Sequence, residues 1–217
     1  VRNDKYDWRG VVPGNTMETL WTKYHKTDEL PQVLNPRSGY LYNANNTPFK
    51  STATNENPNS DNFPKEMGYS ISDNNRSIRI YELIESYDKI DFSDFKSIKF
   101  DYKFPTPFNF NFVDVNQIME MNPENYPEVS ELIKDIQNWD RSTNSDSFGA
   151  GLFAIFYYNL GNYIGKSYIN KNLSKDLIAL MLKDVKSYML NYFNKTKVKL
   201  GEYQKLVRGN KVLPIFG

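Results

Sequence analysis

The chain is organised around the stretch LNPRSGYLYNANNTPF, residues 34–49. It contains an extended segment, a Pro-Arg-Ser-Gly turn, a short alternating strand over residues 40–44, and a pair of asparagines before a proline. Pro48 biases the residue before it toward extended backbone, and asparagines tolerate the unusual φ and ψ angles of a tight turn. The stretch therefore predicts that Asn45 and Asn46 present two carboxamides at the end of a strand.

A carboxamide in this position suits one kind of chemistry. Its N–H groups can donate to a developing negative charge without titrating, which is what an oxyanion hole requires. Taken alone, Asn45 is more often a turn residue, because asparagine is favoured in turns. Arg76, at the start of an expected helix, is by itself more often a surface residue than a catalytic group. On these residues alone, both interpretations stay open.

The composition narrows the classes of function. The chain has 217 residues, of which 39% are hydrophobic and 24% charged, as in a soluble globular protein. Lys and Arg number 27 against 26 Asp and Glu, so no overall charge favours nucleic acid or an anionic membrane. The absence of cysteine excludes disulfides and a cysteine nucleophile, and the single His25 leaves little for a histidine-based triad. The longest apolar run, around residues 149–158, is too short to span a bilayer.

The expected secondary structure changes from extended to helical along the chain. Residues 6–13 favour a short strand, and residues 50–65, rich in Ser, Thr, Asn and Pro, read as a long surface loop. Helices are then expected over residues 76–85, from 93, and over 113–121, 128–139, 147–164 and 174–193.

The first two of these helices carry local start signals. Residues 73–75, Asp-Asn-Asn, offer a cap for the first, and the second starts near Ser93. Its spacing predicts that Phe92, Phe95 and Ile98 are buried.

Strand signals at both ends with helices between predict an α+β fold that is mostly helical. Gly209 and Asn210 separate two apolar runs at the C-terminal end and give a two-residue hairpin signal. We expect three parts: a strand and loop segment over residues 1–72, a helical lobe over 73–196, and a hairpin over 197–217 that returns to the core sheet.

Several motifs together resemble one known family. The segments LPQVLNP at 30–36, SGYL at 38–41 and NANNTP at 43–48 are followed after a loop by Arg76, which opens a helix. This pattern closely resembles the β subunit of the penicillin acylase (penicillin amidase) family of N-terminal nucleophile hydrolases. Further matches are YDWRG at 6–10, VPG at 12–14, WD at 139–140, Ser147 and LVRG at 206–209.

The resemblance implies a fold and a mechanism for amide hydrolysis. The strands near the two ends would belong to an incomplete αββα core. In that family, a serine freed at the β-subunit N-terminus by self-cleavage attacks an amide carbonyl, and its own α-amine acts as the base through water. The first asparagine of the Asn-Asn pair donates to the oxyanion, a role that falls on Asn45 here. The arginine that opens the next helix holds that asparagine and the leaving group, which corresponds to Arg76. Asn43 and Asn46 are expected to support the turn.

The resemblance also bears on partners and cofactors. Family nucleophiles lie upstream of this motif by far more than the 44 residues before Asn45, and Val1 cannot be a nucleophile. We therefore expect an internal piece of a β subunit, inactive alone, whose partners are the α subunit, the rest of the β subunit and a small acyl-amide substrate. The expected location is periplasmic or secreted. We expect no cofactor in the chain itself, and calcium is a candidate for the parent protein.

A different class of function fits the same residues. A helical lobe with exposed tyrosines and asparagines would suit a non-catalytic module that binds a peptide or a glycan. The two hypotheses separate on whether Asn45 faces an open cleft or is turned to bulk solvent in a self-sufficient fold.

Overall fold

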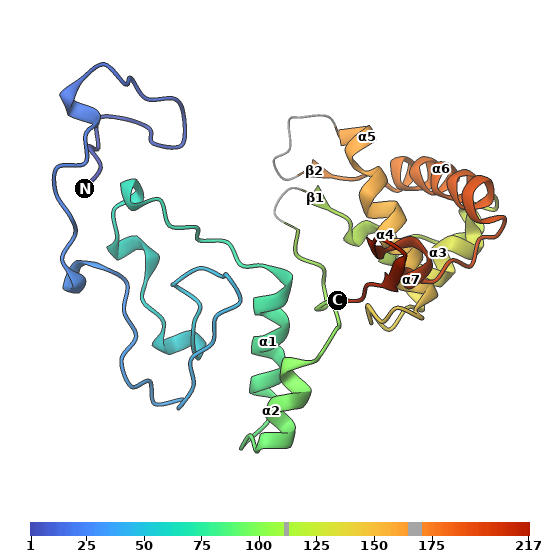
Figure 1. Ribbon diagram of the computed structural model, residues 1–217, viewed down its shortest axis with the longest axis horizontal. Coiled ribbons are helices and arrows are strands. Elements are labelled where there is room, and N and C mark those ends of the chain that lie inside the picture. Colours follow the sequence, from blue (N-terminus) through green and yellow to red (C-terminus); the bar gives the residue numbers. More distant parts are fainter. Residues whose placement is uncertain (111–112, 165–170) are drawn as a thin grey trace. The chain divides into compact units, whose positions relative to one another are not determined.

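The structure is a computed structural model that describes residues 1–110, 113–164 and 171–217 (Figure 1). Contacts between Cα atoms divide the chain into two compact units, Val1–Tyr81 and Glu82–Gly217, and we describe each by itself. Most of the regular structure is helical, and the strands are short. No helix in the described part of the chain is both long and apolar enough to cross a membrane.

The first unit is built from loops and single turns of 3-10 helix up to the start of α1 (Asn75–Glu85). The strand expected over residues 6–13 is not formed. Instead, the Arg9 N–H donates to Asp7 Oδ1 at 3.0 Å, and the Gly10 N–H donates to the Asp7 carbonyl at 3.1 Å. A side chain that binds nearby backbone competes with strand pairing, so this segment turns. The 3-10 turns are η1 (Met17–Thr19), η2 (Thr27–Glu29), η3 (Thr54–Glu56), η4 (Ser60–Asn62) and η5 (Lys65–Met67).

The strand expected over residues 40–44 is also absent. A single backbone hydrogen bond, from the Tyr42 N–H to the Ser51 carbonyl at 2.9 Å, connects this segment to the loop that follows. The next residues then leave the extended conformation, since Asn45 has a φ of 57°. A strand needs a partner along its length, and side chains from the turn occupy backbone groups that such a partner would use.

The helix signals near residue 75 are confirmed. Asn74 caps α1, because its Oδ1 accepts the Ser77 N–H at 3.0 Å. In the second unit, α2 (Phe92–Lys99) is capped by Asp91, whose Oδ1 accepts the Asp94 N–H at 2.9 Å. Asp94 returns the contact to the Asp91 N–H at 3.1 Å, which completes a capping box.

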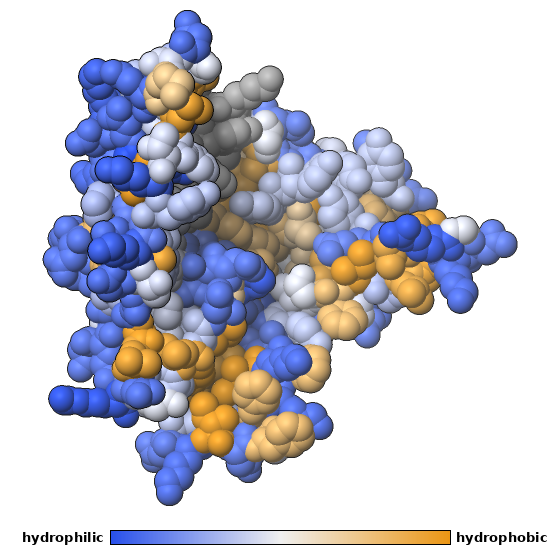
Figure 2. Space-filling view, turned by 60° about the vertical axis from the view of Figure 1, so that its left-hand side comes forward, coloured by the Kyte–Doolittle hydropathy of each residue, from blue (hydrophilic) through white to orange (hydrophobic). Residues whose placement is uncertain are grey.

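The expected burial of α2 is wrong at two of three positions. Ile98 is buried, but Phe92 is 75% exposed and Phe95 is 54% exposed. Helical spacing shows which residues share a side of α2, but it does not show whether another element covers that side. Hydrophobic residues gather in several places on the surface drawn in Figure 2.

The second unit has a helical core around α4 (Phe148–Asn159), which contacts α3 (Ser130–Gln137), α6 (Lys175–Phe193) and α7 (Leu200–Tyr203). The short helix α5 (Gly161–Ile164) follows α4. These elements confirm the helices expected near 128–139, 147–164 and 174–193. The least exposed side chains come mostly from three of them: Leu132, Ile133, Ile136, Ile155, Phe156, Ile178, Met181, Leu182, Val185 and Met189.

Two glycines of α4 allow neighbours to come close. A Cβ atom on Gly151 would lie 2.1 Å from the Val198 carbonyl oxygen, and one on Gly149 would lie 2.3 Å from the Trp139 ring. Both distances are far inside van der Waals contact, so only glycine fits at these places. The backbone leading into α7 therefore packs directly on α4.

The helix expected over residues 113–121 is wrong. The chain forms a two-residue strand, β1 (Val113–Asp114), and then the 3-10 helix η6 (Asn116–Glu120). Asn116 explains the difference, because its Oδ1 accepts the Phe108 N–H and its Nδ2 donates to the Phe108 carbonyl, each at 2.9 Å. Such side-chain contacts to backbone favour turns over a regular helix. β1 pairs in parallel with β2 (Lys171–Asn172), and η7 (Pro123–Asn125) leads into α3.

The C-terminal hairpin is confirmed. Strand β3 (Lys205–Arg208) pairs antiparallel with β4 (Lys211–Pro214) across the expected two-residue turn. Gly209 has a φ of 56°, a conformation that favours glycine and suits a tight hairpin.

All eight strand residues of this hairpin are exposed. Leu206 pairs with Leu213 and Val207 pairs with Val212. Adjacent pairs point to opposite faces, so each face of the hairpin carries an apolar pair. Isolated two-stranded hairpins are marginally stable in water. The continuation of this hairpin into a larger sheet stays a prediction.

Candidate functional site

The asparagine turn is held by its own side chains. Asn43 Oδ1 accepts the Asn45 N–H, and Asn46 Oδ1 accepts the Ala44 N–H, each at 2.8 Å. Asn46 Nδ2 also donates to the carbonyls of Thr47, at 3.3 Å, and of Lys50. Both flanking asparagines are therefore occupied within the turn.

Asn45 differs from its neighbours in backbone and exposure. Its φ of 57° lies in the left-handed region, and its side chain is exposed. The alternation of side chains along a strand does not apply here, because the chain is not extended at Asn45. The local turn, not strand alternation, sets the direction of the Asn45 side chain.

Arg76 lies next to Asn45, as expected. It is the second residue of α1, and its Nη2 donates to Asn45 Oδ1 at 3.0 Å. A guanidinium has only donors, so it fixes which end of the carboxamide faces it. Asn45 Nδ2 therefore points away from Arg76, and it makes no hydrogen bond to any residue within the described ranges. The site thus presents an amide donor whose orientation is set by a cation.

A third residue, which the sequence indicated only as a helix cap, joins the turn to α1. Asn74 Nδ2 donates to the Ala44 carbonyl at 3.1 Å and to the Asn45 carbonyl at 3.3 Å. Only the cap signal could be read from sequence, because these two contacts cross 29 or 30 residues of chain.

A buried carboxylate lies beneath this helix start. Asp73 is 8% exposed and Ser77 is fully buried. Ser77 Oγ donates to Asp73 Oδ1, and Lys50 Nζ lies 3.6 Å from Asp73 Oδ2. A buried charge is stable only when paired and hydrogen-bonded, and both conditions are met here.

Tyrosine rings lie near the same loop. The rings of Tyr40 and Tyr42 are 6.5 Å apart, and those of Tyr42 and Tyr81 are 6.3 Å apart. Burial, with the nearby charge of Asp73 and the ring of Tyr81 adding to it, raises the pKa of Tyr42 to about 12. Tyr42 is therefore a neutral hydroxyl at ordinary pH and cannot serve as a base there.

One known family covers most of this chain. The family model described as Penicillin amidase matches residues 1–209, which include the asparagine turn, α1 and strand β3. The chain belongs to the penicillin amidase family. Membership supports an amidohydrolase-type role, and it implies a hydrolase in the parent protein. It also agrees with a processed precursor that acts on acyl amides.

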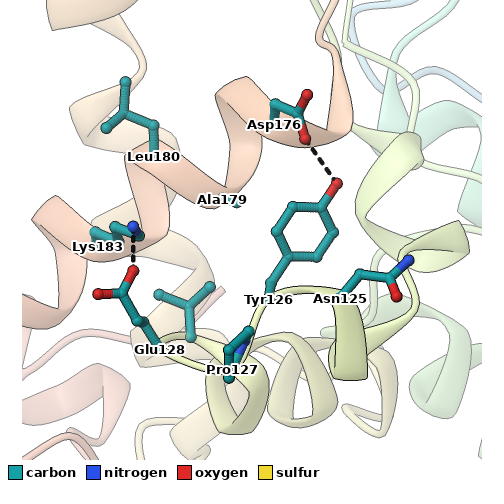
Figure 3. A pocket seen from close by; sticks show the side chains of 9 residues that line it. Asn125, Tyr126, Pro127, Glu128, Asp176, Ala179, Leu180 and Lys183 are labelled. Atoms are coloured by element: carbon teal, nitrogen blue, oxygen red, sulfur yellow. Dashed lines mark hydrogen bonds and ion pairs between the residues drawn. The ribbon is translucent and has the colours of Figure 1, made fainter.

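A separate concavity lies in the second unit of the chain, between α6 and the segment before α3 (Figure 3). Its volume is about 340 Å³. The Tyr126 hydroxyl donates to Asp176 Oδ1 at 2.9 Å, and Lys183 pairs with Glu128. These polar groups are engaged with one another, so we assign the concavity no chemistry of its own.

Calcium, a candidate cofactor of the parent protein, finds no ligand set here. The ranges 1–110, 113–164 and 171–217 contain no group of three or more His, Asp or Glu side chains placed to hold a metal ion. Hard cations such as calcium need six to eight oxygen ligands. Calcium in the parent protein stays a prediction.

Proposed function

We propose that this part of the protein supplies the oxyanion donor of a penicillin acylase-like amide hydrolase. One observation carries the proposal: Arg76 holds Asn45 Oδ1 at 3.0 Å, which leaves Asn45 Nδ2 oriented and without a partner in the described chain. A preoriented neutral donor suits a negative charge that forms only during the reaction.

The proposed reaction proceeds through an acyl-enzyme. The hydroxyl of an N-terminal serine, outside these 217 residues, attacks the amide carbonyl, and its α-amine takes the proton through water. The carbonyl oxygen becomes an oxyanion, to which Asn45 Nδ2 donates. Collapse of this intermediate expels the amine, which takes the proton back from the α-amine, and water then hydrolyses the ester to release a carboxylic acid and restore the serine hydroxyl. Loss of one such donor costs about 2.7–4 kcal/mol in enzymes generally.

We propose that the rest of the protein completes the site. The α subunit and the remainder of the β subunit would supply the nucleophile and the acyl pocket, while this chain would supply the donor. By family resemblance we propose a periplasmic or secreted enzyme that acts on a small acyl amide. Acyl-pocket residues outside this chain would decide among β-lactam side chains, acyl-homoserine lactones and lipopeptides.

The test is Asn45→Ala in the intact, self-processed enzyme, assayed with a panel of acyl amides of a chromogenic amine. We expect precursor cleavage to proceed and kcat to fall by a factor of about 10²–10³ with little change in KM, the pattern of an interaction made only in the transition state. Asn59→Ala is the matched control, since Asn59 is an exposed asparagine that only caps η4. Unchanged kcat in Asn45→Ala would contradict the proposal.

A further inference from the structure

We infer that Asn74 is a positioning residue that holds the Asn45 turn against the start of α1. The inference rests on the proposed function, because it concerns how the oxyanion donor is kept in place. Asn74 makes no hydrogen bond to Asn45 Nδ2, and it acts through the backbone carbonyls of the turn.

The Asn74 side chain uses both halves of its carboxamide. Its Oδ1 accepts the Ser77 N–H at 3.0 Å and so caps α1. Its Nδ2 donates to the carbonyls of Ala44, at 3.1 Å, and Asn45, at 3.3 Å. Asparagine offers an acceptor and two donors at this side-chain length, whereas the other common caps, Ser, Thr and Asp, lack the amide donor. One side chain therefore both caps α1 and binds the Asn45 turn.

The contacts of Asn45 hold its left-handed backbone conformation, which asparagine tolerates better than most residues. A non-glycine residue in the left-handed region persists where the surrounding structure fixes it. Three polar groups of Asn45 are fixed by three residues: its N–H by Asn43, its carbonyl by Asn74 and its Oδ1 by Arg76. Asn74 and Arg76 both come from the start of α1, so the distance from helix to turn determines whether Arg76 can reach Asn45.

The backbone of Asn74 is itself held in place by Ser77. The Asn74 N–H donates to Ser77 Oγ at 3.2 Å, and Ser77 Oγ lies 2.9 Å from the Asn74 carbonyl oxygen. Ser77 also donates to the buried Asp73. These contacts fix the backbone of Asn74, from which its side chain reaches the Asn45 turn.

Asn74→Asp separates the two roles in the processed enzyme. The new carboxylate keeps the acceptor for the Ser77 N–H and places a favourable charge at the helix N-terminus. It loses the donors and turns an oxygen toward the Ala44 and Asn45 carbonyls. We expect precursor processing to continue, while kcat falls roughly ten- to a hundredfold with KM unchanged, as for a displaced catalytic group.

Two further variants make the result specific. Asn59→Asp introduces the same charge at a cap whose Oδ1 accepts only the Asp61 N–H, at 3.0 Å, and it should alter neither kcat nor stability. In an Asn45→Ala background, Asn74→Asp should lower kcat no further, because a positioning residue acts only through the group it positions.

A readout independent of turnover is the side-chain amide NMR signal of Asn45 in selectively labelled processed enzyme. It should shift in Asn74→Asp and stay in place in Asn59→Asp. An unmoved signal overturns the inference, as does unchanged kcat in Asn74→Asp when Asn45→Ala is slow. If Asn45→Ala retains full activity, the proposed oxyanion role falls instead, so the two failures are distinct.

Discussion

Removal of the Arg76 side chain should weaken catalysis by disordering the Asn45 amide. In Arg76→Ala, the 3.0 Å contact from Nη2 to Asn45 Oδ1 is lost. Both side chains are exposed, so solvent screens the contact and its worth is about 0.5–1.5 kcal/mol. That free energy holds the carboxamide in the one orientation that points Nδ2 toward the reaction, against the other rotamers that an exposed side chain can adopt.

Loss of this free energy should lower kcat only modestly. We expect kcat to fall roughly two- to tenfold in Arg76→Ala, far less than the factor of about 10²–10³ expected for Asn45→Ala. Arg76→Lys should recover part of the loss, because a lysine keeps the charge and can donate once. The measurement is steady-state kinetics of both single variants and the double variant in the processed enzyme.

The double variant gives the decisive result. If Arg76 acts only through Asn45, adding Arg76→Ala to Asn45→Ala should change kcat no further. A loss in Arg76→Ala as large as that in Asn45→Ala, or additive losses in the double variant, would refute the reasoning and place Arg76 on the reacting atoms. Arg9→Ala, at an exposed arginine in a turn, controls for the change of charge.

Two other predictions concern stability. The pKa of Tyr42 rises from its ordinary value of 10.0 to about 12 in the folded chain. The neutral hydroxyl of Tyr42 therefore adds to the free energy of unfolding fully below about pH 10, and this stabilisation is lost as the pH rises toward 12. Thermal melts of Tyr42→Phe should show a shallower alkaline loss, and an unchanged pH dependence would contradict this. Gly151→Ala should lower Tm strongly, because its Cβ would lie 2.1 Å from the Val198 carbonyl oxygen, whereas Gly161→Ala has open space and should be near neutral. Equal melts of the two glycine variants would argue against the close packing.

Elements fixed by local signals could be predicted from the sequence. Ser174 caps α6 through the Leu177 N–H, and the turn at Gly209 sets the register of the hairpin. The strand expected over residues 6–13 could not form, because Asp7 binds backbone groups within its own segment. Competition between side chains and a distant strand partner is decided in three dimensions, and a residue pattern does not record it.

The residues of the candidate site show the same difference between local sequence signals and long-range contacts. The motif brought out Asn45 and Arg76, which lie 31 residues apart in sequence and in contact in the structure. Asn74 was seen only as a cap, because its second role depends on backbone carbonyls 29 and 30 residues away. The sequence predicted a tight turn at the asparagine pair, but it did not show that Asn45 is the residue with the left-handed φ, since either asparagine is compatible with it.

Arg76 binds only the oxygen of the Asn45 carboxamide, and this has a consequence for the protein in storage. Asparagine side chains are thermolabile, and slow deamidation replaces the amide nitrogen with oxygen. At Asn45 the oxygen that accepts from Arg76 would survive, and its new charge would strengthen that contact. The atom lost would be Nδ2, the proposed donor to the oxyanion. An old preparation could therefore keep its fold and its length while its active fraction declines, and a mass increase of about one dalton at this residue would be the trace.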